Sequence, residues 1–239
     1  MRAQELTLTV EANSTNSHSQ RQLYVRRSSR MSKAQAQGYA KLPDLRLELQ
    51  ALREHFSGKA DKIFVEIGFG NGEVLAQMAQ QNPTWQCVGI DVYRPGIGAL
   101  INRCTRAELK NVRIVDEEAT TVLERIPAAS IDLLFVLFPD PWPKQKHRRR
   151  RLVNAEFAQL LHTKLSATGI VYFATDAEDY AEQIQSAMGA SFFRFDINRI
   201  EPIPQTRYRQ KALKAGYTIW DLAYTRDRTP ARTSEKLEV

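Results

Sequence analysis

The sequence predicts an α/β fold in which a doubly wound, mostly parallel sheet ends in an antiparallel pair of strands. Two observations lead to this class. Short apolar runs alternate with helix-like stretches from residue 61 to residue 188, which is typical of a parallel sheet covered by helices on both faces. The last two apolar runs, 192–197 and 217–224, are joined by a long polar loop, so they are expected to pair as strands. A chain of 239 residues fits one such domain with extensions.

The order of the elements follows from the spacing of apolar residues and from local stop signals. Two short helical stretches, broken by Pro43, are predicted between residues 32 and 56. The first long helix ends at Asn82-Pro83, because proline cannot continue a helix. The predicted strands cover residues 63–67, 86–91, 113–115, 131–138 and 170–174, and the predicted helices cover residues 73–81, 95–109, 152–165 and 177–188. The chain thus divides into a flexible basic arm (1–32), a short helical lead-in (33–60), the main domain (61–228) and a polar tail (229–239).

The first strand ends in a glycine turn that predicts an anion or nucleotide site. It reads Glu66-x-Gly68-x-Gly70-x-Gly72, and a helix follows from Glu73. Glycine lets the backbone approach a ligand closely, and the start of a helix offers unpaired N–H groups. A dinucleotide fingerprint has glycine at the sixth position, where this chain has Glu73. The spacing instead resembles the first motif of Rossmann-like S-adenosylmethionine (SAM) methyltransferases; a plain tight turn is the alternative.

The second strand ends in an acid, Asp91, which lies 19 residues beyond Gly72. Folds of this type place a carboxylate there to bind a ribose. A carboxylate can accept hydrogen bonds from both ribose hydroxyls, so Asp91 is the predicted ribose ligand.

The fourth strand leads into Phe-Pro-Asp-Pro-Trp-Pro-Lys at residues 138–144. Ligands of open α/β sheets bind beyond the carboxyl ends of the strands, so Asp140 is a candidate site residue. Three prolines in five residues restrict the loop, which favours a carboxylate held ready for a substrate. The order resembles the Asp-Pro-Pro-aromatic loop of amino-methyltransferases and so predicts a base as substrate. A proline-rich turn with a buried tryptophan is the alternative.

Basic residues are concentrated in two places, and the whole chain carries a formal net charge of +7. Six cations occur among residues 144–151, directly after the Asp140 loop, and could neutralise several phosphates. The N-terminal arm combines arginines with Tyr24, which could order on RNA by pairing to phosphates and stacking on a base. For both segments, a solvated surface is the alternative.

Two further segments carry candidate residues. The fifth strand is followed by Asp176, which either faces the same edge as Asp140 or serves as a helix N-cap ahead of Glu178 and Asp179. Before the last strand, residues 204–211 form a polar, basic loop with Tyr208 at its centre.

The sequence does not support a metal site, a signal peptide or a membrane span. Cys87 and Cys104 lack the spacing of a metal site and are expected to be reduced structural thiols in a cytosolic protein, so no metal is predicted. The N-terminus has no apolar signal region, and the longest apolar run, at residues 133–138, is too short to span a membrane.

Taken together, five segments resemble the bacterial tRNA (guanine-N7-)-methyltransferases over roughly residues 24–226. They are residues 66–72 (Glu-Ile-Gly-Phe-Gly-Asn-Gly), 89–92 (Gly-Ile-Asp-Val), 138–142 (Phe-Pro-Asp-Pro-Trp), 174–176 (Ala-Thr-Asp) and 206–208 (Thr-x-Tyr). The resemblance implies a class I SAM methyltransferase fold, SAM as cofactor, tRNA as partner and methyl transfer to guanine N7, with the variable loop as the expected place. It is compatible with a monomer or a homodimer.

The resemblance also implies roles for individual residues. SAM contacts are implied at Glu66, Asp91, Glu118 and Asp140, beside the glycines Gly68, Gly70 and Gly72. Contacts to tRNA or guanine are implied at Lys144, Lys146, His147, Arg148, Arg149, Arg150, Arg151, Asp176, Thr206, Arg207, Tyr208 and Arg209. Two positions depart from the family pattern: Glu118, where Asp or Asn is common, and Arg209, where Glu is usual.

Guanine N7 carries a lone pair and no proton, so its methylation needs no obligate general base. The product is a guanine cation, and a fixed carboxylate near it lowers the barrier; Asp140 is the predicted catalytic residue. Asp176 could select guanine by accepting from its N1–H and 2-amino group. Two alternatives are a methyltransferase acting on an exocyclic amine of a base and a non-catalytic tRNA-binding paralogue. A C5-pyrimidine enzyme would need a nucleophilic cysteine near residues 138–144, where there is none.

Overall fold

The structure of the chain is a computed structural model that describes residues 30–58, 60–197, 200–201, 205–226 and 237–238. Nearly all of the predicted basic arm (1–32) therefore lies outside the described residues. The same is true of the predicted tail (229–239), apart from a short strand, β9 (Leu237–Glu238), which pairs with β7 (Ile200–Glu201).

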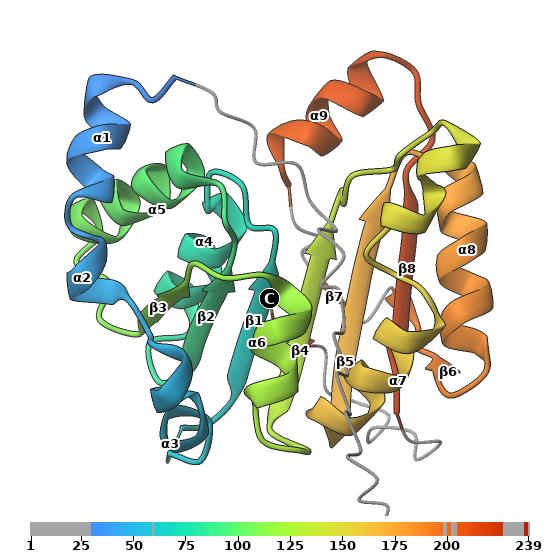
Figure 1. Cartoon of the computed structure of the whole chain (residues 1–239), viewed down its shortest axis with the longest axis horizontal. Helices are drawn as coiled ribbons and strands as arrows, with labels where there is room; N and C mark the ends of the chain where they lie inside the picture. Colours follow the sequence, from blue (N-terminus) through green and yellow to red (C-terminus); the bar gives the residue numbers. More distant parts are fainter. Residues whose placement is uncertain (1–29, 59, 198–199, 202–204, 227–236, 239) are drawn as a thin grey trace, which may run out of the picture.

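A seven-stranded sheet forms the centre of the molecule, with the strand order β3-β2-β1-β4-β5-β8-β6 (Figure 1). The first five strands run parallel, and β8 is antiparallel to both β5 and β6. The bounds are β1 (Ile63–Ile67), β2 (Gln86–Ile90), β3 (Val112–Val115), β4 (Ile131–Leu137), β5 (Leu165–Thr175), β6 (Phe193–Arg194) and β8 (Trp220–Thr225). The predicted α/β class and the antiparallel C-terminal pair are confirmed, with β8 inserted between β5 and β6.

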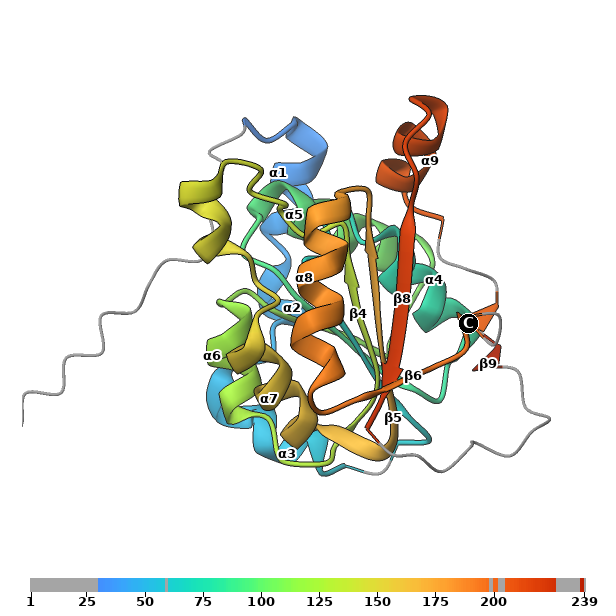
Figure 2. The ribbon, with the colours of Figure 1, turned by 90° about the vertical axis from the view of Figure 1, so that its right-hand side faces the viewer.

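Helices cover both faces of the sheet, which explains why its central strands are apolar along their whole length. Side chains alternate between the faces: Val65 and Ile67 belong to one buried cluster, and Phe64 belongs to the other. Figure 2 shows α6, α7 and α8 on one side of the sheet and α4 on the other. The helices are α1 (Lys33–Tyr39), α2 (Leu42–Leu45), α3 (Leu52–Phe56), α4 (Glu73–Gln81), α5 (Arg94–Arg106), α6 (Ala119–Arg125), α7 (Ala155–Lys164), α8 (Glu178–Gly189) and α9 (Arg207–Lys214), with 3-10 turns η1 (Leu49–Ala51) and η2 (Gln145–Arg150).

The lead-in helices pack against the β3 side of the sheet. The backbone N–H of Leu47 donates to the carbonyl of Ile114 at 2.8 Å, and Arg46 pairs with Asp116 at 2.7 Å, so this segment covers the outer edge of β3. Above it, α1 crosses α5 at two glycines. A Cβ atom at Gly98 would lie 2.1 Å from the carbonyl oxygen of Gln35, so only glycine permits this approach.

Several elements differ from the sequence prediction; the strand predicted at 170–174, for example, begins at Leu165. The helix predicted at 152–165 begins at Ala155, because the Asn154 side chain accepts from the N–H of Phe157 and caps the helix there. Helix α6 is not predicted; the Glu118 side chain caps it. Part of the predicted polar loop before the last strand is α9, capped by Thr206.

Replacement of Gly98 by alanine should lower the stability of the protein by about 1–3 kcal/mol, the usual cost of forcing an extra carbon into a packed contact. Thermal unfolding measures this. Gly189→Ala is the matched control, because a Cβ there meets nothing within 4 Å and alanine favours a helix. Equal melting temperatures for Gly98→Ala and the wild type would contradict the glycine contact between α1 and α5.

Candidate active site

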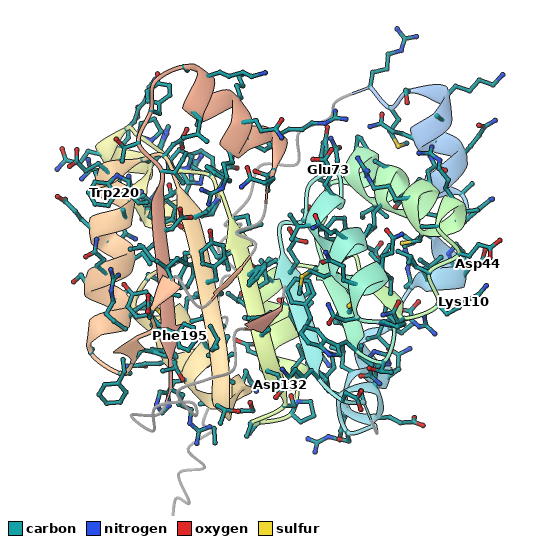
Figure 3. All side chains as sticks on the ribbon, turned by 180° about the vertical axis from the view of Figure 1, so that it is seen from behind. Asp44, Glu73, Lys110, Asp132, Phe195 and Trp220 are labelled. Carbon is teal, nitrogen blue, oxygen red and sulfur yellow. The ribbon has the colours of Figure 1, made fainter. Side chains whose placement is uncertain are left out.

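Five parallel strands end at one edge of the sheet, and each brings an acidic residue to it. The register pairs Ile67 with both Ile90 and Val136, and Leu137 with Ala174, so the neighbouring strands end nearly level. The acids at or just beyond these ends are Glu66, Asp91, Glu118, Asp140 and Asp176. Figure 3 shows Glu73 and Trp220 at this edge and Asp132 at the opposite one. The tertiary structure therefore gathers residues that are 110 positions apart in the sequence.

The glycine turn after β1 leaves space for a ligand. Gly68 and Gly70 have φ angles of 70° and 55°, and a Cβ built at either would meet no atom within 4 Å. Helix α4 follows immediately, and its N-cap position is Gly72, so no side chain caps its first N–H groups. An exposed turn of this shape beside the positive end of a helix suits a polar or anionic group of a ligand.

Glu66 is buried on the α4 side of the sheet, with 3% of its surface exposed. Its Oε2 atom has no hydrogen-bond partner. Burial, together with the charge of Asp91, raises the pKa of Glu66 to about 8, and the backbone N–H of Leu75 acts in the opposite direction. A buried carboxyl group with an unpaired oxygen suits a positively charged or hydrogen-bonding ligand.

Asp91 is held by the backbone on both sides. Its Oδ2 accepts from the N–H of Gly70 at 3.0 Å, and its Oδ1 accepts from the N–H of Tyr93 at 2.9 Å. Each oxygen keeps a further lone pair for a ligand. Burial raises the pKa of Asp91 to about 6 against the effect of these N–H groups, and the charge of Asp140 adds to the rise. Asp140 is thus near enough for its charge to act on Asp91.

The Asp140 loop has a strained backbone. Phe138 and Trp142, which flank Pro139-Asp140-Pro141, have φ angles of 50° and 43°, a region that large side chains rarely adopt. Such strain persists only where the surroundings enforce it, and it is concentrated at functional sites. Asp140 itself is exposed at the carboxyl edge of the sheet.

The basic run after this loop forms η2, on the α8 side of the carboxyl edge. Lys144, Lys146, Arg148 and Arg149 are exposed, and Arg150 lies over the Trp142 ring at 4.9 Å. Partial burial and the surrounding cations lower the pKa of His147. Most of the run is thus a positively charged surface next to Asp140.

Arg151 is a correction to the predicted set of RNA contacts, because only 1% of its surface is exposed. Its Nε donates to the carbonyl of Pro141 at 2.7 Å, and its guanidinium pairs with Asp179 at 2.6 Å. It also donates to Gln183 at 3.0 Å and lies over the Tyr180 ring. The side chain contacts protein on all sides and leaves almost no surface for a ligand.

The structure decides the alternative for Asp176. The N-cap of α8 is Ala177, without a side-chain cap, while Thr175 accepts from the N–H of Ala177 at 3.2 Å. Asp176 is exposed at the end of β5, so the N-cap alternative is wrong. Glu118, by contrast, accepts from the N–H of Thr121 at 3.0 Å and caps α6.

Helix α9 brings the late segment to the opposite side of the same edge (Figure 2). Arg207 pairs with Glu73, the first residue of α4, at 2.8 Å, and Glu73 also pairs with Arg103. Tyr208 is 62% exposed and stacks against Phe138, with 6.3 Å between the ring centroids. An exposed tyrosine beside the Asp140 loop is suited to stacking on a base.

Arg209, one of the two positions that depart from the family pattern, is also a correction to the predicted RNA contacts, because it is 6% exposed and points inward. It donates to Asp221 Oδ2 at 3.0 Å and to the Tyr172 hydroxyl at 2.8 Å, and it pairs with Asp221 Oδ1 as well. Burial alone lowers the pKa of Arg209, but the Asp221 hydrogen bond and charge outweigh this and raise it. The extra cation is thus neutralised inside the protein. Sequence reasoning missed Asp221 and Tyr172, whose only signal is a polar group within an apolar strand.

The cysteines, the possible metal ligands and the helix lengths each bear on a different class of function. Cys87 and Cys104 are free and buried, and burial raises their pKa values to about 12 and about 11, which makes both poor nucleophiles. Within the described residues, no cluster of His, Cys, Asp and Glu side chains could hold a metal ion. None of the helices in that part of the chain combines the length and apolarity required to cross a membrane.

Comparisons with known proteins give a consistent result. A family model described as "Putative methyltransferase" matches residues 60–222. A tRNA (guanine-N(7)-)-methyltransferase from Nitrosococcus oceani is 38% identical over 212 residues, which cover 85% of this chain and 89% of that protein. One of the same description from Acidithiobacillus ferrooxidans is 36% identical over 223 residues, which cover 88% and 96%.

Two solved structures share the fold. The antibiotic-resistance methyltransferase Kmr superposes with a TM-score of 0.53 at 15% identity, covering 75% of this chain and 93% of its own. The aminoglycoside resistance methyltransferase NpmB1 gives a TM-score of 0.51 at 16% identity, covering 76% and 95%.

The pKa of Glu66 predicts a pH dependence of stability for the ligand-free protein. Because the folded-state pKa of about 8 exceeds the ordinary value of 4.5, the folded protein keeps a proton that the unfolded chain releases. Stability should therefore fall as pH rises from about 5 to 8. Glu66→Gln removes this titration, so its melting temperature should fall less over the same interval. Parallel curves for the two proteins would contradict the assignment.

Proposed function

This chain belongs to the family of tRNA (guanine-N(7)-)-methyltransferases, and we propose that its residues act as follows in transferring a methyl group from SAM to N7 of a guanine in tRNA. The proposed reaction is supported by relatives described as tRNA (guanine-N(7)-)-methyltransferases, which are 34–38% identical over most of the chain. The gathering of Glu66, Asp91 and Asp140 at one edge of the sheet is the observation that supports their roles.

The residues at the glycine turn fit SAM. Bound SAM supplies an electrophilic methyl group on a positively charged sulfonium. Glu66, with a buried and unpaired oxygen, is placed to hold a positively charged part of such a ligand. Asp91 keeps lone pairs for the ribose hydroxyls, and Gly68 and Gly70 leave the turn open to a close approach. Glu118, at the end of β3, completes the set that we assign to the cofactor.

Asp140 is the catalytic residue in this proposal. Guanine N7 attacks through a lone pair, so the protein must align the two groups, and alignment can contribute roughly 7–11 kcal/mol. The base becomes a cation during transfer, and a carboxylate fixed beforehand stabilises that charge without reorganising. The strained Asp140 loop supports this role. Asp176, exposed at the end of β5, is assigned to the N1–H and 2-amino edge of guanine.

The tRNA is assigned to the two basic elements that flank this edge. On the α8 side, η2 offers Lys146 and Arg149, and Lys144 lies just before it. On the α4 side, α9 offers Arg207 and the exposed ring of Tyr208. A base presented between them would reach Asp140 while its phosphates meet the cations. The variable loop is the expected part of the tRNA, and this substrate favours a cytoplasmic location.

Methylation of unmodified tRNA tests the function and Asp140 together. The wild-type protein with SAM should yield N7-methylguanine, identified by nucleoside mass spectrometry. Asp140→Asn keeps the shape but not the charge, and its single-turnover rate should fall about 100-fold, as for the loss of one preorganised electrostatic group. Its affinity for tRNA should change far less. Methyl groups on an exocyclic amine would reject the product, and a near-normal rate in Asp140→Asn would reject the role.

The salt dependence of tRNA binding tests the basic surface. Lys146→Gln with Arg149→Gln should weaken binding and lower the slope of log affinity against log salt by roughly 1 for each phosphate that the protein no longer neutralises. SAM affinity should stay as in the wild type. Arg106→Gln with Lys110→Gln removes the same charge from exposed positions at the far end of α5 and just before β3, and is the control. If both pairs change the slope equally, the effect is one of net charge only.

A further inference from the structure

We propose that Arg151 and Arg209 are positioning residues that hold the two ends of the loop at residues 138–142 and so set the place of Asp140. This inference rests on the proposed role of Asp140 in methyl transfer. Within the described residues, these are the two arginines that are buried. They approach the loop from the two sides of the sheet, because Arg151 lies over Tyr180 of one buried cluster and Arg209 donates to Tyr172 of the other.

Arg151 holds the C-terminal half of the loop. Its Nε donates to the carbonyl oxygen of Pro141, the residue directly after Asp140, at 2.7 Å. The rest of its guanidinium is fixed on α8, where it donates to the Asp179 carboxylate and to Gln183. Helix α8 is itself packed on the sheet through buried residues. The carbonyl of Pro141 is therefore tied through Arg151 to a rigid element.

Arg209 contacts the N-terminal end of the loop. Its guanidinium lies over the ring of Phe138 at 6.0 Å, a cation–π distance. The same guanidinium is fixed by Asp221 on β8 and by the hydroxyl of Tyr172 on β5. Tyr208, its neighbour on α9, stacks against the same Phe138 ring. Two strands and one helix thus set the orientation of Phe138.

The backbone of the loop is restricted in the hydrogen bonds that it can donate and in its φ angles. Pro139 and Pro141 have no N–H to donate, while Phe138 and Trp142 adopt costly left-handed φ angles. The N–H of Phe138 donates to the carbonyl of Ala174, which ties the loop to β5 at its start. Arg151 and Arg209 add contacts at Pro141 and at Phe138.

The two arginines are poorly explained by stability alone. A buried guanidinium carries a large desolvation cost, and a well-packed apolar pair of similar volume is often at least as stable. The Nε of Arg209 is buried without a hydrogen-bond partner, a cost that a purely structural group has no reason to carry. Retention of both residues at one loop is therefore better explained by the position of Asp140.

The experiment compares Arg151→Met and Arg209→Met with wild type by single-turnover methylation, tRNA affinity and SAM affinity. Each variant should lose about 10- to 100-fold in rate, because a displacement of about 1 Å at a reacting group can cost 100-fold. Both affinities should stay within about 3-fold of wild type. Arg194→Met is the matched control: Arg194 lies over the Tyr224 ring on β8, far from the loop, and its loss should leave the rate unchanged.

Amide hydrogen exchange supplies a readout that does not depend on methylation. Exchange at Phe138, Asp140 and Trp142 should be at least 10-fold faster in both variants, while the amides of β1 keep their wild-type protection. If wild-type protein proves inactive on tRNA, the proposed function fails, yet the exchange result still decides whether the arginines hold the loop.

A second set of variants separates the loss of loop positioning from a loss of folding. Arg151→Lys keeps the charge beside Asp179 but cannot bind Pro141, Asp179 and Gln183 together, so it should also lose rate. In Arg209→Met with Asp221→Leu the buried charges are removed as a pair, which should restore the melting temperature and leave the rate low. The proposal is overturned if the rate recovers with stability, if loop exchange is unchanged, or if Arg151→Met lowers the salt slope as an RNA-binding residue would.

Discussion

Glu66 is buried at the end of β1, and its Oε2 atom has no hydrogen-bond partner within the protein. A group of this kind costs stability in the free protein, and the packed sheet around it offsets that cost. The parallel strands bring Asp91 close enough to raise the pKa of Glu66, and Asp140 close enough to raise that of Asp91. The site is therefore a set of coupled acids that extends from the buried Glu66 to the exposed Asp140. It is suited to a cofactor that carries positive charge and to a base that acquires one.

Charge is distributed in layers around this edge. The acids lie at the strand ends, and the cations lie outside them on η2 and α9. This arrangement separates two tasks that would otherwise conflict. Exposed lysines and arginines attract the phosphates of RNA at long range, while the acids act on the cationic centres formed inside. The ion pair between Glu73 and Arg207 connects the acids to the cations, because it joins α4, which follows the glycine turn, to α9, which carries Tyr208.

Arginines in the same sequence context have different functions in this fold. Arg149 and Arg151 are two residues apart in one basic run, yet the first is exposed and the second is enclosed by α8 and the Asp140 loop. Arg209 follows the exposed Arg207 by two residues and is likewise enclosed, by β5 and β8. The departure from the family pattern at Arg209 therefore adds no free cation at this edge of the sheet, because Asp221 neutralises it.

The sequence by itself determined the fold class, the glycine turn after β1 and the order of the candidate site residues along the chain. Glycine spacing, proline stops and the apolar runs of β1 to β5 depend on near neighbours, and they remain readable without the fold. Helices α6 and α9 were not predicted from the sequence, because their caps, Glu118 and Thr206, lie in polar segments without a helical repeat of apolar residues. Only the tertiary structure decided which arginines are exposed and which are buried. Arg151 meets Asp179 and Gln183 across 28 and 32 residues, and Arg209 meets Tyr172 across 37. Whether an arginine is buried by residues so distant in the sequence depends on how the strands and helices pack. The pattern of charges along the chain does not contain that information.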